Sequence, residues 1–157
     1  FTKYAPTAGF LPLRTLIADR VRGRTGVPVD AGNMVVTTGA VGGIYSVLAA
    51  LIDPGDEVLL PDPVWPNYRS IVHVTGGRAV SFPLRPESGF LPDPKELVAR
   101  ITARTKLLVI NTPCNPTGTI LPGEMLSVLG EIAEQTGVWI VSDESTRAIG
   151  TLCGFQR

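Results

Sequence analysis

The sequence is poor in the residues on which several kinds of functional site depend. Its 157 residues include one histidine, His73, and two cysteines, Cys114 and Cys153, which lack the CxxC spacing. A histidine-rich metal centre is therefore excluded, and a disulfide scaffold, a structural zinc site or a Ser-His-Asp triad is disfavoured. The 14 basic and 14 acidic side chains cancel, so we expect no nucleic-acid partner of the kind that needs a basic surface.

Two common phosphate-binding motifs are also missing from the sequence. The chain has no Gly-Lys dipeptide and no GxGxxG pattern, which argues against a P-loop and a dinucleotide fingerprint. Residues 31–52 carry no charge and are long enough to cross a membrane, but their polar side chains and four glycines favour a strand, a turn and a buried helix. The start, Phe1-Thr2-Lys3-Tyr4, resembles a chain cut within a domain rather than a signal peptide. We expect a cytoplasmic protein with no membrane partner.

The chain does contain alternating helical and strand patterns, and its 44% hydrophobic residues suit the core of one domain. Strands with continuous apolar runs, separated by helices, predict an α/β fold, a three-layer sandwich with a mainly parallel sheet. Helices are expected at residues 11–24, 43–52, 67–74, 94–101 and 122–136, and five strands at 34–37, 57–60, 78–82, 106–110 and 138–141.

Polar and glycine-rich segments follow four of the five expected strands, and ligands of such sheets bind beyond the carboxyl ends of the strands. The turn at residues 38–43 opens a helix whose free N–H groups suit a phosphate, although its glycines also suit tight packing. Trp65 suits stacking on a planar ligand or a lid over the core. Asp143 suits a cationic or proton-sharing ligand or a helix N-cap. The most specific segment is Asn111-Thr112-Pro113-Cys114-Asn115-Pro116-Thr117-Gly118.

Together these segments carry a family resemblance over about residues 3–144. The chain resembles the class I/II aminotransferases, the fold-type I pyridoxal-phosphate enzymes, and most of all their aspartate and aromatic aminotransferase-like branch. The segments that match, in chain order, are Lys3-Tyr4-Ala5-Pro6, Gly9 with Leu13-Arg14, Val36-Thr37-Thr38-Gly39-Ala40, Leu51-Ile52-Asp53-Pro54-Gly55-Asp56-Glu57-Val58, Pro63-Val64-Trp65-Pro66-Asn67-Tyr68, Gly89-Phe90-Leu91-Pro92-Asp93, Asn115-Pro116-Thr117-Gly118 and Val141-Ser142-Asp143-Glu144.

The resemblance implies a cofactor, pyridoxal 5'-phosphate, and a role for each matching residue. The backbone of Gly39, Ala40 and Val41 would hold the phosphate, and Trp65 would stack on the pyridine ring. Asn115 would hydrogen-bond the phenolic oxygen of the ring, and Asp143 would pair with its protonated nitrogen. Tyr4 resembles a tyrosine that reaches the phosphate site of a neighbouring subunit, which implies a homodimer. The Asp62–Pro63 and Asn115–Pro116 bonds match positions that are often cis.

The resemblance also implies a function and a partial fold. Residues 1–157 would be part of the cofactor-binding large domain, with about five of its seven strands and an unmatched tail at 145–157. The whole protein would move an amino group between an amino acid and a 2-oxo acid in amino-acid metabolism. The alternatives are a C–S lyase, an aminocyclopropane-carboxylate synthase-like enzyme, or the effector domain of an aminotransferase-like transcription regulator. The amino acid that it acts on is not readable from these residues.

Two departures from the family bear on activity. A tyrosine is usual three residues after the aspartate, where this chain has Thr146. The Schiff-base lysine of the family matches none of the three lysines present, Lys3, Lys95 and Lys106. We therefore expect no catalytic residue in the chain, negligible activity of the isolated polypeptide and poor stability, since two strands in the middle of the family's sheet would be missing.

Overall fold

The computed structural model describes residues 3–146, and it divides the chain within one helix into two compact units, residues 1–43 and 44–157. The first unit contains a helix that begins after Phe10 and a short 3-10 helix. The second contains the whole sheet. The elements, in chain order, are α1 (Leu11–Thr25), η1 (Ala31–Asn33), α2 (Gly39–Leu51), β1 (Glu57–Asp62), α3 (Asn67–Val74), β2 (Arg78–Pro83), η2 (Pro86–Ser88), α4 (Pro94–Val98), β3 (Thr105–Asn111), α5 (Gly123–Thr136) and β4 (Trp139–Asp143).

The sheet of the second unit has four parallel strands in the order β2-β1-β3-β4. Strands β1 and β3 lie in the middle, and their apolar runs are almost wholly buried. Continuous apolar strands are typical of a parallel sheet that is covered on both faces. Because all four strands point the same way, their carboxyl ends lie along one edge of the sheet.

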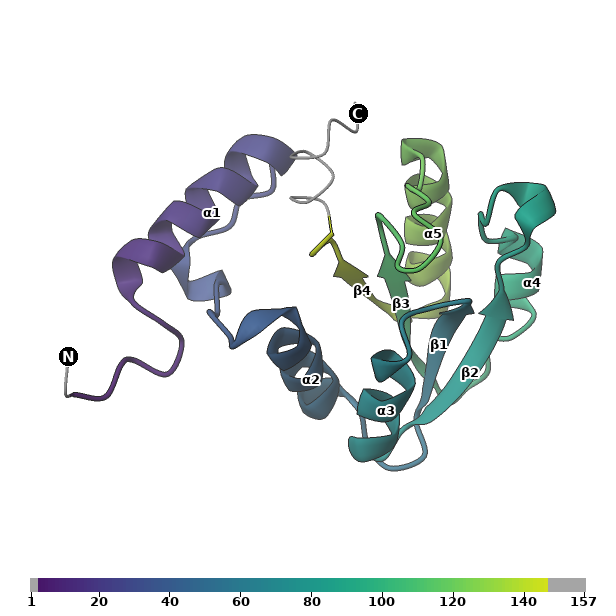
Figure 1. The fold of residues 1–157 in the computed structure, drawn as a ribbon, viewed down its shortest axis with the longest axis horizontal. Coiled ribbons are helices and arrows are strands. Elements are labelled where there is room, and N and C mark those ends of the chain that lie inside the picture. The colour runs from purple at the N-terminus through teal and green to yellow at the C-terminus, as the bar shows by residue number, and fades with distance from the viewer. Residues whose placement is uncertain (1–2, 147–157) are drawn as a thin grey trace. The chain divides into compact units, whose positions relative to one another are not determined.

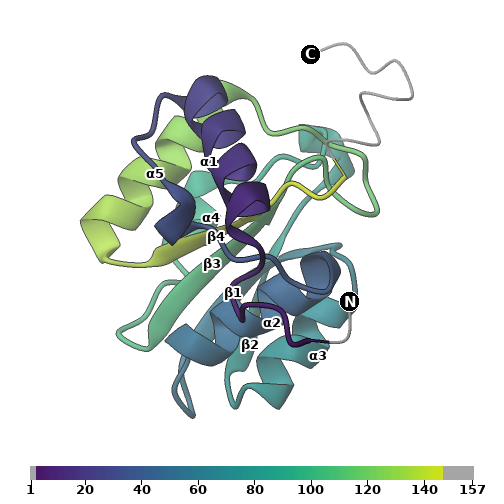
Figure 2. The ribbon, with the colours of Figure 1, turned by 90° about the vertical axis from the view of Figure 1, so that its left-hand side faces the viewer.

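Helices cover both faces of this sheet (Figures 1 and 2). One apolar cluster joins α3 and the second part of α2 to β1 and β3, and it includes Leu48, Tyr68 and Val109. The other cluster joins α4 and α5 to the opposite face, and it includes Leu97, Leu108 and Leu129. Side chains alternate between the two faces along a strand, so Leu108 and Val109 enter different clusters. The predicted three-layer α/β arrangement is confirmed.

One predicted strand is wrong. Residues 34–37 form no strand, so the described part of the chain has four strands instead of five. The β-branched run in this segment favours extended backbone, and the segment is extended next to η1. Its main-chain bond to another segment runs from the Val36 N–H to the carbonyl of Ala8, at 3.0 Å. That partner is itself irregular, and a strand needs a ladder of such bonds.

The rest of the chain follows the expected order. No helix among residues 3–146 is long and apolar enough to cross a membrane. The helix anticipated at 43–52 is found as α2, which begins earlier, at Gly39, and ends at Leu51. The predicted tail at 145–157, unmatched to the family, falls almost entirely outside the described residues, and its lack of a match stays a prediction.

Candidate active site

Asp143 ends strand β4 and lies opposite Asn111, the last residue of β3, in the register of the two strands. The backbone carbonyl of Asp143 accepts hydrogen bonds from the Thr112 N–H at 3.0 Å and from the Asn111 side chain at 3.1 Å. The main chain of Asp143 is therefore anchored to the central strand from both the backbone and a buried amide side chain.

The carboxylate of Asp143 is held at both oxygens. The Tyr68 hydroxyl donates to Oδ2, and the Ser145 N–H donates to Oδ1 at 2.9 Å. Burial by itself raises the pKa of the Asp143 carboxyl, but the hydrogen bonds from Tyr68 and Ser145 outweigh it, so the pKa lies below its ordinary value. Asp143 is therefore an ionised, oriented acceptor at the carboxyl edge of the sheet.

Trp65 follows strand β1 and is half-buried. The Asp62–Pro63 peptide bond before it is cis, as expected, and Pro66 after it begins the turn into α3. The edge of one ring meets the face of the other between Trp65 and Tyr68, with ring centroids 5.6 Å apart and an interplanar angle of 85°. Trp65 is thus linked through Tyr68 to Asp143.

Asn115 lies in a constrained loop that follows β3. The Thr112–Pro113 and Asn115–Pro116 bonds are both cis, of which the second was expected. The Asn115 N–H donates to the side-chain oxygen of Asn111 at 2.7 Å, and the Gly118 N–H donates to the Cys114 carbonyl at 2.7 Å. The Asn115 side chain is exposed and has no hydrogen-bond partner among the described residues, so its amide is available to a ligand.

The predicted phosphate residues belong to the first unit and open helix α2. Gly39 has a φ of +75°, which disfavours any residue with a side chain. Ala40 and Val41 lie in the first turn, where N–H groups have no partner within a helix. The glycines at 42 and 43 also serve packing, because a Cβ at Gly42 would lie 2.9 Å from the Thr38 hydroxyl oxygen. Tyr4, in the same unit, is fully exposed.

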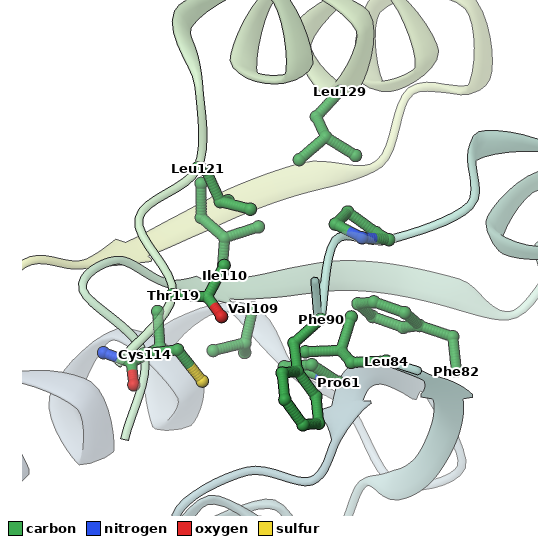
Figure 3. A pocket seen from close by; sticks show the side chains of 12 residues that line it. Pro61, Phe82, Leu84, Phe90, Val109, Ile110, Cys114, Thr119, Leu121 and Leu129 are labelled. Atoms are coloured by element: carbon green, nitrogen blue, oxygen red, sulfur yellow. The ribbon is translucent and has the colours of Figure 1, made fainter. Parts of the chain in front are cut away.

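An apolar cavity of about 20 Å³ lies behind the Asn115 loop (Figure 3). Cys114, Thr119 and Leu121 line one side of it, and Phe82, Leu84 and Phe90 line the other. A cavity must exceed about 10–15 Å³ to hold one water molecule. This one has room for about one water molecule and is far too small for a pyridine ring.

The structure therefore brings together three of the residues predicted from sequence, Trp65, Asn115 and Asp143. Tyr68 and Asn111, which connect them, had no role assigned from sequence. The sequence did point to both residues, because they lie in the motifs that contain Trp65 and Asn115. Their shared partner Asp143 is distant along the chain, however, 75 residues from Tyr68 and 32 from Asn111, and only the folded structure identifies it. The phosphate residues and Tyr4 lie in the other unit, and their roles stay predictions.

Known proteins match this chain over most of its length. Residues 1–145 match the family model described as aminotransferase class I and II. A probable aspartate/prephenate aminotransferase of Thermus aquaticus is 43% identical over 143 residues, which are 91% of this chain and 37% of that protein.

Solved structures agree as well. The aspartate aminotransferase of Thermus thermophilus with maleate has a TM-score of 0.89 at 41% identity, over 91% of this chain and 37% of that one. The N-succinyldiaminopimelate aminotransferase of Mycobacterium tuberculosis has a TM-score of 0.86 at 36% identity, over 91% of this chain and 38% of that one. The chain thus spans little more than a third of the length of these relatives, and its fold is that of part of their large domain. The chain belongs to the class I and II aminotransferase family.

Proposed function

We propose that this chain supplies part of the pyridoxal-phosphate site of an enzyme that moves an amino group between an amino acid and a 2-oxo acid. The observation that carries the proposal is the oriented, ionised carboxylate of Asp143, connected by hydrogen bonds and ring contact to Trp65 and to the Asn115 loop. The relatives reported above are all named as aminotransferases, which favours amino transfer over a lyase, a synthase-like enzyme or a regulator.

The residues present fit the cofactor chemically. Asp143 is an anionic acceptor suited to a protonated pyridine nitrogen, and the half-buried Trp65 has an aromatic face suited to a flat ring. The unpartnered amide of Asn115 can donate to a phenolic oxygen. The first turn of α2, with Gly39, Ala40 and Val41, suits the phosphate.

When bound, pyridoxal phosphate supplies an electron sink for negative charge at the substrate α-carbon. The part of this chain is to keep the ring nitrogen protonated through Asp143 and to hold the ring plane through Trp65. The fully exposed Tyr4 suits contact with a second copy of the chain, so we also propose a homodimer. A cytoplasmic location remains part of this proposal.

Cofactor binding is tested with pyridoxamine 5'-phosphate, which has no aldehyde to react with surface lysines. The chain has two tryptophans, Trp65 and Trp139, and Trp139 is exposed on β4, so Trp139→Phe is a matched control. We expect ligand-dependent quenching of fluorescence in the wild type and in Trp139→Phe, and its loss in Trp65→Phe.

The contribution of the Asp143 carboxylate to the affinity for pyridoxamine 5'-phosphate is tested by substitution. Asp143→Asn is expected to weaken binding at least tenfold, measured by calorimetry, because a charge-assisted hydrogen bond contributes more than about 1.4 kcal/mol. The control is Asp93→Asn at the N-cap of helix α4. Equal affinity in the wild type, Asp143→Asn and Trp65→Phe would refute the proposed site.

A further inference from the structure

Tyr68 is the largest of the fully buried side chains in the described part of the chain, and it carries a polar group into the core. It lies near the start of α3 and belongs to the apolar cluster between α2, α3 and the sheet. A phenol in such a place needs a hydrogen-bond partner, because an unpartnered buried hydroxyl is costly. The partner is the carboxylate of Asp143, 75 residues further along the chain.

Tyr68 also contacts the other predicted ring-binding residue of this edge. Its ring meets that of Trp65 in the edge-to-face arrangement described above. One rigid side chain therefore spans the distance between the residue proposed to stack on the cofactor and the residue proposed to pair with its nitrogen. Because Tyr68 is enclosed by the core, it has little freedom to move away from either neighbour.

The hydrogen bond to Asp143 has a defined direction. Burial, together with the Asp143 carboxylate and the thiol of Cys114, raises the pKa of the Tyr68 phenol well above its ordinary value. The phenol stays protonated across the range in which enzymes work, so it is always the donor. The Ser145 N–H donates to the other carboxylate oxygen. An ionised carboxylate has about four lone-pair positions, so Asp143 keeps the capacity to accept a further hydrogen bond from a ligand.

We propose that Tyr68 is the positioning residue that orients the Asp143 carboxylate for the nitrogen of the cofactor ring. The inference rests on the proposed function, in which Asp143 pairs with that nitrogen. It adds a residue that touches no reacting atom and acts through Asp143. Without the hydroxyl, burial is the main influence left on Asp143, opposed only by the hydrogen bonds of Ser145, and the carboxyl takes up a proton more readily.

The first test needs no cofactor, so it stands independently of the proposed function. The carboxyl carbon of Asp143 and the amide of Ser145 are followed by NMR as a function of pH in the 157-residue chain. In Tyr68→Phe we expect the pKa of Asp143 to rise by about one unit, a tenfold gain in proton affinity. The matched control is Tyr45→Phe, which removes the hydroxyl of an exposed tyrosine on α2 and is expected to leave the titration unchanged.

A wild-type measurement covers the case in which Tyr68→Phe does not fold. The hydroxyl proton of Tyr68 is expected as a slowly exchanging resonance that shifts when Asp143 is protonated. An Asp143 titration that is the same in the folded variant and in the wild type would overturn the inference. So would a Tyr68 hydroxyl proton that exchanges rapidly and does not respond to the Asp143 titration.

The second test uses pyridoxamine 5'-phosphate labelled with ¹⁵N in the ring. In the wild type and in Tyr45→Phe, the ring nitrogen is expected to stay protonated to higher pH than in free solution. In Tyr68→Phe, the ring nitrogen is expected to lose its proton at a pH about one unit lower than in the wild type. An equally protonated ring in Tyr68→Phe would overturn the positioning role. A wild-type chain that binds no ligand would instead refute the proposed function, and the first test would still decide whether Tyr68 controls Asp143.

Discussion

Glu57 is a buried carboxylate: its burial costs free energy, and its hydrogen bonds stabilise the fold. It begins the central strand β1, and its side chain is only 2% exposed. The carboxylate accepts hydrogen bonds from the Arg78 guanidinium and from the hydroxyls of Thr102 at 2.8 Å and Thr105 at 3.3 Å. Burial raises the pKa of Glu57, but these bonds outweigh it and hold the pKa below its ordinary value. The group lies at the opposite end of β1 from Trp65 and thus serves the fold.

Because the pKa of Glu57 is lower in the folded chain than in the unfolded one, its contribution is present above about pH 4.5 and is lost as the pH falls through the folded value. Glu57→Gln is expected to lower the free energy of unfolding at neutral pH by about 1–3 kcal/mol. It should also flatten the loss of stability as the pH falls below about 4.5.

Urea unfolding over this pH range measures both effects. The control is Glu134→Gln, a change at an exposed glutamate of α5, which is expected to behave like the wild type. A Glu57→Gln chain with the wild-type pH dependence would show that Glu57 is not the group responsible.

At the scale of elements, helix boundaries were predictable where a local stop signal exists. Helix α3 occupies the predicted residues 67–74, and α5 ends at Gly137, which has a positive φ. Helix α4 was predicted to reach residue 101 but ends at Val98. The reason is that the N–H groups of Arg100 and Ile101 bond to carbonyls three residues back, which tightens the chain out of the α-helical pattern.

The start of α4 offers a prediction about capping. The Asp93 side chain accepts a hydrogen bond from the Lys95 N–H at 2.8 Å, as the sequence pattern of an N-cap followed by Pro94 indicates. Asp93→Ala is expected to lower the free energy of unfolding by about 1 kcal/mol, and Asp93→Asn to change it by only a few tenths, because asparagine caps equally well. Thermal and urea unfolding measure the difference, and similar losses in both variants would contradict a capping role.

At the scale of the whole molecule, the positions of the three lysines bear on whether this chain can react covalently with the proposed cofactor. Lys95 lies in α4 and lines a groove between α4 and α5. Lys106 is near the start of β3, about 17 Å from the carboxyl end of that strand at 3.3 Å per residue. Lys3 is exposed in the first unit. The carboxylate, amide and aromatic groups of the site can bind a ligand, but they do not replace a covalent amine.

The isolated 157-residue chain is therefore expected to show turnover at least a thousandfold below the roughly 10 s⁻¹ typical of enzymes. The assay supplies pyridoxal phosphate, an amino acid and 2-oxoglutarate, and it measures the new amino acid. Lysine-to-arginine variants at positions 3, 95 and 106 serve as controls. Turnover that is abolished in one of them would show that this chain does contain the reactive amine. The expected poor stability of the chain also stays a prediction.

The sequence by itself determined the class of fold, the order of the buried strands and which polar residues follow them, because these depend on local apolar patterns and on turn residues. It placed Trp65, Asn115 and Asp143 at one edge of a parallel sheet. The sequence pattern at residues 34–37 wrongly predicted a strand. An extended, β-branched segment becomes a strand only where a neighbouring strand is available. Tertiary structure alone decided that Tyr68 donates to Asp143 and that Asn111 bridges Asp143 and Asn115. Tyr68 and Asn111 lie 75 and 32 residues from Asp143 along the chain, and hydrogen bonds between such distant residues exist only once the strands and helices have packed.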